Sequence, residues 1–145
     1  MDTVFVVLHV VSGVFLVGPM AILPMVGLRA LRAREAGAVA TTAKSVRLFT
    51  WLSLIVVVLG FGALGMSDPK DHFSFSSTWV WLSLAAYVVA MLVNLLVVLP
   101  ALRSASTELA SGGTGKPAGY SRIAAGSGIT ALLLVLIVVL MVWKP

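Results

Sequence analysis

Two histidines, His9 and His72, have the most versatile chemistry in this chain. An imidazole nitrogen can bind haem iron or copper, or exchange a proton near neutral pH. His9 stands inside an apolar stretch, whereas His72 follows Asp71 in a polar segment. Two histidines without a regular spacing are fewer than a haem or copper site uses, so a neutral imidazole bonded to a carbonyl or hydroxyl is the simpler interpretation. We predict no metal and no cofactor, and keep a haem or copper site at His9 and His72 as an alternative.

Polar side chains inside another apolar stretch form a second candidate site. Ser83, Tyr87 and Asn94 lie at positions i, i+4 and i+11, which places them on one stripe of a helix. Asn94 is the strongest member, because hydrocarbon cannot satisfy the donors and the acceptor of its amide. We expect this stripe to contact another helix or a partner protein. No carboxylate lies inside an apolar stretch, which argues against a substrate or ion site.

Prolines and small residues mark places where helices bend or approach closely. Pro19 and Pro24 remove backbone donors from the first apolar stretch, which frees the carbonyls of Phe15 and Met20 and allows two kinks. Small residues near these prolines and in the last apolar stretch are expected to pack against other helices or against a partner. They are Gly13, Gly18, Ala124 and Gly128.

Four long uncharged apolar runs must position these residues, and they cover residues 3–28, 48–66, 78–102 and 123–143. About 20 apolar residues cross the hydrocarbon core as a helix, which satisfies its backbone groups within its own segment. With 145 residues, 60% of them hydrophobic and 10% charged, the chain has material for four spans and short connections but for no separate soluble domain. We predict an all-α polytopic membrane protein, an up-down bundle of four transmembrane helices forming a single domain over residues 1–145.

A short similarity between the first and third runs suggests that a helical hairpin is used twice. Leu23-Pro24 and Leu99-Pro100 each stand about one helical turn before a basic residue. This similarity pairs Pro24 with Pro100.

The distribution of basic residues orients the chain in the membrane. The connections between the first and second runs and between the third and fourth runs hold an excess of Lys and Arg, whereas the segment 67–77 does not. The positive-inside rule places the basic connections in the cytoplasm, and both termini on the extracytoplasmic side. The first run does not resemble a secretory signal, because Asp2 precedes it and basic residues follow it. We expect a multi-pass protein of the bacterial inner membrane.

The net charge of +5 follows from the same basic residues. Because they flank membrane spans, we expect them to meet anionic lipids rather than nucleic acid. The chain has no cysteine and no complete nucleotide-binding motif, and we predict that it is not an enzyme and has no catalytic residue.

The start of the chain resembles a known family. Residues 8–18, Leu-His-Val-Val-Ser-Gly-Val-Phe-Leu-Val-Gly, continuing through Pro19 to Arg29, are similar to the first span of small bacterial four-helix predicted integral membrane proteins of unknown function. That family is distantly similar to the membrane part of copper-resistance D proteins. The resemblance implies a four-span layout and implies that His9 belongs to the family's pattern. The further histidines that a copper or haem site needs are not matched in this chain.

Three functions from different classes are compatible with these features. The first is a non-catalytic helical accessory subunit of a larger inner-membrane complex, with a bacterial respiratory assembly as its most concrete form. The second is a small transporter or channel, which would have to oligomerise to build a path. The third is a haem- or copper-binding membrane protein that uses His9. We favour the accessory subunit, because the chain has neither intramembrane charge nor a soluble domain.

Overall fold

The computed structural model describes residues 3–66, 76–112 and 119–143. Within these ranges the chain is almost entirely helical, and its four long helices, Thr3–Arg32, Ala36–Gly65, Thr78–Ala110 and Tyr120–Trp143, are long and apolar enough to cross a membrane. The predicted all-α polytopic fold is therefore confirmed. Most of the segment 67–77 and residues 113–118 of the last connection lie outside the described residues.

Two of the four long helices contain a short π-helical segment, in which backbone bonds run from residue i to i−5. The first long helix consists of α1 (Thr3–Ser12), η1 (Gly13–Val17) and α2 (Gly18–Arg32). The third consists of α4 (Thr78–Val93), η3 (Asn94–Val98) and α5 (Leu99–Ala110). The other two are the continuous helices α3 (Ala36–Gly65) and α6 (Tyr120–Trp143).

All four long helices continue beyond their apolar runs at the end of the molecule that contains the residue 33–35 turn, which we call the basic end. The 30 residues of α3 make about 45 Å at 1.5 Å per residue, whereas the hydrocarbon core is about 30 Å thick. A tight turn joins α2 to α3, in which Arg34 has a φ of 58° and the Glu35 N–H donates to the Ala30 carbonyl at 3.1 Å. The first connection is therefore a helical hairpin that projects out of the apolar zone.

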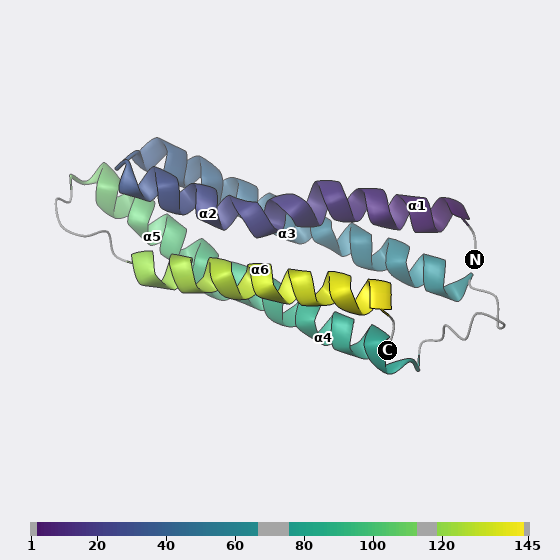
Figure 1. Ribbon diagram of the computed structural model, residues 1–145. Coiled ribbons are helices and arrows are strands. Elements are labelled where there is room, and N and C mark those ends of the chain that lie inside the picture. Colours follow the sequence, from purple (N-terminus) through teal and green to yellow (C-terminus); the bar gives the residue numbers. More distant parts are fainter. Residues whose placement is uncertain (1–2, 67–75, 113–118, 144–145) are drawn as a thin grey trace.

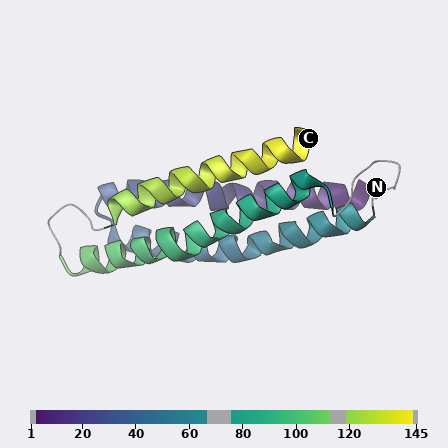
Figure 2. The same ribbon diagram turned by 90° about the horizontal axis from the view of Figure 1, so that it is seen from below.

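The four spans are not packed equally along their length (Figures 1 and 2). Toward the basic end, α2 packs against α3 and α6, and α3 packs against α5. A buried cluster around Leu31, Val46, Leu102 and Ile123 fills this half. Toward the other end, where both chain termini lie and which we call the termini end, the helices form two pairs, α1 with α3 and α4 with α6.

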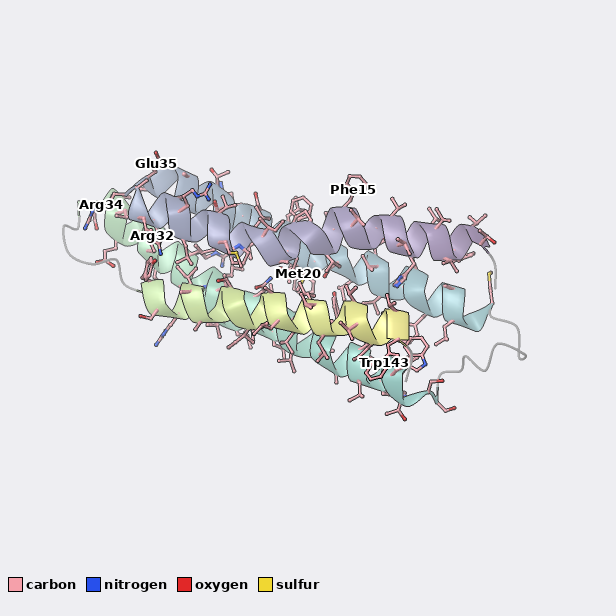
Figure 3. The ribbon with its side chains drawn as sticks, in the orientation of Figure 1. Phe15, Met20, Arg32, Arg34, Glu35 and Trp143 are labelled. Atoms are coloured by element: carbon pink, nitrogen blue, oxygen red, sulfur yellow. The ribbon has the colours of Figure 1, made fainter. Side chains whose placement is uncertain are left out.

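The first span is the most peripheral of the four. No residue of α1 is buried, and only 6% of the most apolar stretch of this span is buried, against 22% to 39% in the other three. Phe15 points away from the other helices, whereas Met20 is fully buried beside α6 (Figure 3). The span therefore leaves the periphery and enters the core between these two residues.

Candidate functional site

Asn94 lies at the point where the four spans meet, and its side chain is fully buried. Its Nδ2 donates to the backbone carbonyl of Met20 at 3.4 Å. In a regular helix that carbonyl would accept the N–H of the residue four positions later, but this residue is Pro24, which has no N–H. The amide of the third span thus satisfies the carbonyl that the proline of the first span leaves free.

The same amide also reaches the second and the fourth span. Asn94 Nδ2 donates to Thr50 Oγ1 at 3.4 Å, and the Thr130 hydroxyl donates to Asn94 Oδ1 at 3.1 Å. Thr50 and Thr130 are both fully buried. One side chain therefore makes hydrogen bonds to all three other spans, using both donors and one lone pair of its acceptor.

The buried polar contacts continue through α3 to α4. The Ser53 hydroxyl lies 2.6 Å from the Tyr87 hydroxyl and donates to the carbonyl of Thr50 at 2.6 Å. Ser83 donates to the Trp79 carbonyl of its own helix at 2.7 Å. The stripe Ser83, Tyr87 and Asn94 is thus buried inside the chain, and in the described residues every buried side-chain polar atom has a hydrogen-bond partner.

Sequence reasoning identified Asn94, Tyr87 and the free Met20 carbonyl, but it did not connect them and it missed Thr50 and Ser53. Hydroxyls three positions apart in an otherwise apolar run were the available signal. A pattern of this kind indicates which face of a helix is polar, but the partner across the bundle depends on how the helices cross.

A π-segment precedes a proline in both interrupted spans. The Gly18 N–H donates to the Gly13 carbonyl and the Leu99 N–H to that of Asn94, and Pro19 and Pro100 follow directly after these donors. The structure thus relates Pro100 to Pro19, whereas the sequence similarity pairs it with Pro24. Asn94 begins one of the two segments, so the residue that joins the spans also lies where the helix changes its winding.

His9 is partly buried against the second span. Its Nδ1 lies 2.8 Å from the Val56 carbonyl, which accepts, so Nδ1 carries the proton and Nε2 is unprotonated in the neutral ring. The ring packs on Gly60, where an added Cβ would lie 2.8 Å from His9 Cε1. The described residues contain no group of three metal-ligating side chains, and His72 lies outside them. The haem or copper alternative thus depends on a single placed histidine.

Within the described residues, the close approaches between helices occur at other glycines than Gly13, Gly18 and Gly128, whose expected contact with a partner stays a prediction. An added Cβ would lie 2.7 Å from Leu102 at Gly27, 2.9 Å from Phe5 at Gly62 and 2.6 Å from Val98 at Gly126. Among the described residues, nothing lies within 4 Å of such a Cβ at Gly18 or Gly128, and at Gly13 the nearest atom, in Val56, is at 3.9 Å. Ala124 is half-buried beside Gly128 on α6. Gly18 and Gly128 therefore leave open surface, where only a contact with another molecule would use their small size.

Four helices of membrane-spanning length, joined by buried hydroxyl and amide groups, define a polytopic α-helical membrane protein. A family model described as "Predicted integral membrane protein (DUF2269)" matches residues 3–145, and the chain belongs to this family. Searches of the curated proteins and of the solved structures each found no significant match. The resemblance to a membrane-protein family of unknown function is confirmed, while the distant similarity to copper-resistance D proteins stays a prediction.

Proposed function

We propose that this membrane protein is a non-catalytic helical subunit that packs against a larger complex of the bacterial inner membrane, with a respiratory assembly as the most concrete case. The observation that carries the proposal is the peripheral first span, whose outer part, α1, buries no residue and packs mainly against α3. A helix held on one side leaves most of its surface for another molecule.

Open glycines support a protein neighbour rather than lipid alone. Acyl chains cover Val and Leu side chains as well as a helix does, so exposed aliphatic residues do not discriminate between the two. A glycine is different, because it lets a second backbone approach closely, and such packing holds helices together in membranes. Gly18 and Gly128 present this kind of surface on the first and fourth spans.

The polar side chains favour a structural role over transport. A solute path through a membrane is lined by polar or charged groups that face water. Here Asn94, Tyr87, Thr50 and Thr130 are buried, and they bond to other groups of the same chain. We expect them to hold the bundle together, and the specificity for a partner to come from the outer faces of the helices.

Native electrophoresis of gently solubilised membranes tests the proposal. We expect the wild-type protein to migrate in a complex much larger than itself, and Gly128→Leu to shift it toward the free form without lowering its own unfolding temperature, because the site is open. Gly37→Leu is the matched control, since Gly37 is equally open but lies near the start of α3, next to the residue 33–35 turn. This variant should leave the complex intact.

Two outcomes would overturn the proposal. A wild-type protein that migrates only as a monomer or homo-oligomer at native expression would favour the small oligomeric transporter or channel. A visible haem spectrum or stoichiometric copper in the purified protein, lost on His9→Ala, would favour the haem- or copper-binding alternative.

A further inference from the structure

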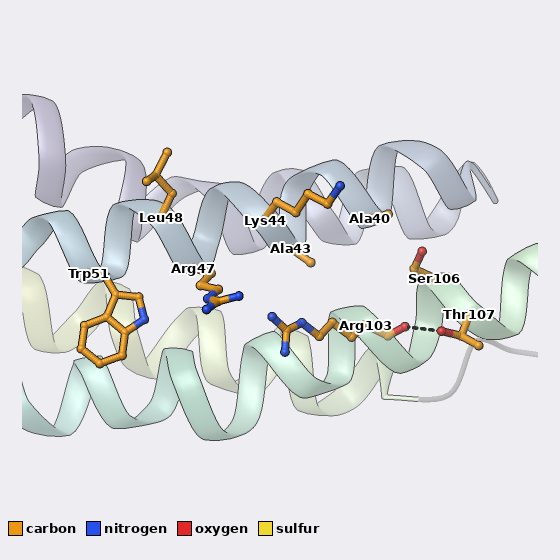
Figure 4. Close-up of a pocket in the computed structure, with 9 residues that line it drawn as sticks. All are labelled: Ala40, Ala43, Lys44, Arg47, Leu48, Trp51, Arg103, Ser106 and Thr107. Carbon is orange, nitrogen blue, oxygen red and sulfur yellow. Dashed lines mark hydrogen bonds between the residues drawn. The ribbon is translucent and has the colours of Figure 1, made fainter.

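A groove runs between α3 and α5 near the basic end, with a volume of about 640 Å³ (Figure 4). Residues of both helices line it: Ala40, Ala43, Lys44, Arg47, Leu48, Trp51, Arg103, Ser106 and Thr107. The hydroxyl of Ser106 donates to the Ala36 carbonyl at 3.1 Å, which joins α5 to the start of α3 at one end of the groove. Ala40 and Ala43 contribute only small side chains to the lining, which leaves space between the two helices.

Two arginines from opposite walls face each other in this groove. The guanidinium groups of Arg47 and Arg103 point toward one another, and Lys44 lies one turn further along α3 (Figure 4). Within the part of the chain that the structure describes, no carboxylate pairs with any of these three cations. Like charges that converge without a counter-ion repel each other, and an anion between them would reverse the sign of that interaction.

On the opposite face of the bundle, an arginine of α2 has an acceptor within the protein. Arg32 Nε donates to the Tyr120 hydroxyl at 2.6 Å, and the guanidinium lies 5.4 Å from the centre of the Tyr120 ring. Among the described residues, Arg47 and Arg103 have no such acceptor, so contacts in this part of the chain do not explain their arrangement.

The groove also crosses the border between polar and apolar surface. Leu48 and Trp51 form one of its ends and are about half exposed, at 55% and 51%. The apolar run of the second span begins at Leu48, directly after Arg47. Tryptophan is enriched at the level of lipid headgroups, so this border corresponds to the membrane interface.

We propose that this groove binds one anionic phospholipid, with its phosphate between Arg47 and Arg103 and an acyl chain along Leu48 and Trp51. Guanidinium groups bind phosphate oxygens in pairs of parallel hydrogen bonds, and two of them from separate helices enclose one phosphate. Free inorganic phosphate offers the same oxygens, but it would leave the apolar end of the groove unused. The assignment does not depend on the accessory-subunit role, because any neighbouring complex can leave a lipid in place.

Quenching of Trp51 fluorescence by brominated lipids tests this assignment. The full-length chain with Trp79, Trp81 and Trp143 replaced by Phe retains Trp51 as its only tryptophan. In mixed bilayers, we expect brominated phosphatidylglycerol to quench Trp51 more strongly than brominated phosphatidylcholine at equal mole fraction. Arg47→Gln and Arg103→Gln should each reduce this preference roughly five-fold, since a basic residue near an anionic surface contributes about 1 kcal/mol.

A matched double variant separates the groove from general surface charge. Arg29→Gln with Arg122→Gln removes two exposed basic residues from α2 and α6, outside the groove, and should leave the preference at Trp51 unchanged. Arg47→Lys with Arg103→Lys keeps the charge but loses the paired guanidinium hydrogen bonds, so it should retain only part of the preference, between that of the native arginines and that of the double Gln variant. An unfolding curve for each variant excludes loss of the fold as the cause.

Three results would overturn the assignment. The first is equal quenching by the two lipids in the protein with native arginines. The second is a preference that survives the double replacement of Arg47 and Arg103 by Gln. The third is displacement of the brominated anionic lipid by inorganic phosphate but not by chloride at the same ionic strength, which would identify free phosphate as the ligand. None of these results depends on whether the protein joins a larger complex.

Discussion

The half of the bundle at the basic end, the basic half, and the half at the termini end, the termini half, are packed in different ways. Toward the basic end, α2, α3, α5 and α6 surround a core whose largest members are fully buried. Toward the termini end, α1 packs against α3 and α4 against α6, and α1 buries no residue. The helices of the termini end, α1 and α4, are more apolar than α2 and α5 of the basic end, so hydrophobicity does not explain why the basic end is the more closely packed. Asn94 lies where one arrangement changes into the other, and its bonds join all four spans at that level.

Helix association in lipid therefore depends on close packing and on hydrogen bonds rather than on apolar area. Hydrocarbon tails solvate Leu and Val as well as a neighbouring helix does, so only close packing and polar contacts hold spans together. The basic half has both close packing and buried hydrogen bonds between spans. The termini half has close contacts at Gly60 and Gly62, but these two contacts join only α1 to α3.

Replacing a closely packed glycine by leucine should have the largest effect on the free energy of unfolding. This effect should be larger in the basic half than in the termini half. Gly126→Leu would place a Cβ 2.6 Å from Val98, a fully buried side chain of the core, and should destabilise the protein by about 3 kcal/mol, at the upper end of overpacking costs. Gly62→Leu also clashes, with the Phe5 ring at 2.9 Å, but α1 can move outward and should limit the cost to about 1 kcal/mol. Unfolding by denaturing detergent in mixed micelles measures both. Equal losses would contradict the distinction between the halves.

Removing the Asn94 amide should have the next largest effect. Asn94→Leu keeps the side-chain size but leaves the Met20 carbonyl without its donor, and should lower the free energy of unfolding by about 0.6 to 2 kcal/mol. Thr41→Val is the control, because the Thr41 hydroxyl bonds only to the Gly37 carbonyl of its own helix. If the Asn94→Leu protein is as stable as this control, the Asn94 amide does not stabilise the contacts between the spans.

The sequence predicted most of this fold because the apolar runs and the basic connections are determined by the membrane. Proline chemistry also predicted the free carbonyl of Met20, which requires no knowledge of the tertiary structure. The sequence did not predict that Asn94 would donate to this carbonyl, or that Gly126 rather than Gly128 would contact the third span. Those features depend on the rotation of each helix about its axis, which the π-segments change by inserting a residue into the turn. Periodicity along one span does not contain that information.

The smallest effect should come from the Tyr87 hydroxyl, at the edge of the polar contacts. Tyr87→Phe removes one partner of the 2.6 Å contact with Ser53, but Ser53 keeps its bond to the Thr50 carbonyl and is not left unsatisfied. We therefore expect a loss of about 0.6 kcal/mol, the average for such bonds in a membrane protein. Ser53→Ala should cost more, because it leaves the buried Tyr87 hydroxyl without the Ser53 partner. Mixed-micelle unfolding of the two single variants and the double variant gives the coupling energy. A coupling energy near zero would show that the Ser53–Tyr87 contact between α3 and α4 adds no stability beyond the hydrogen bonds that Asn94 makes between the spans.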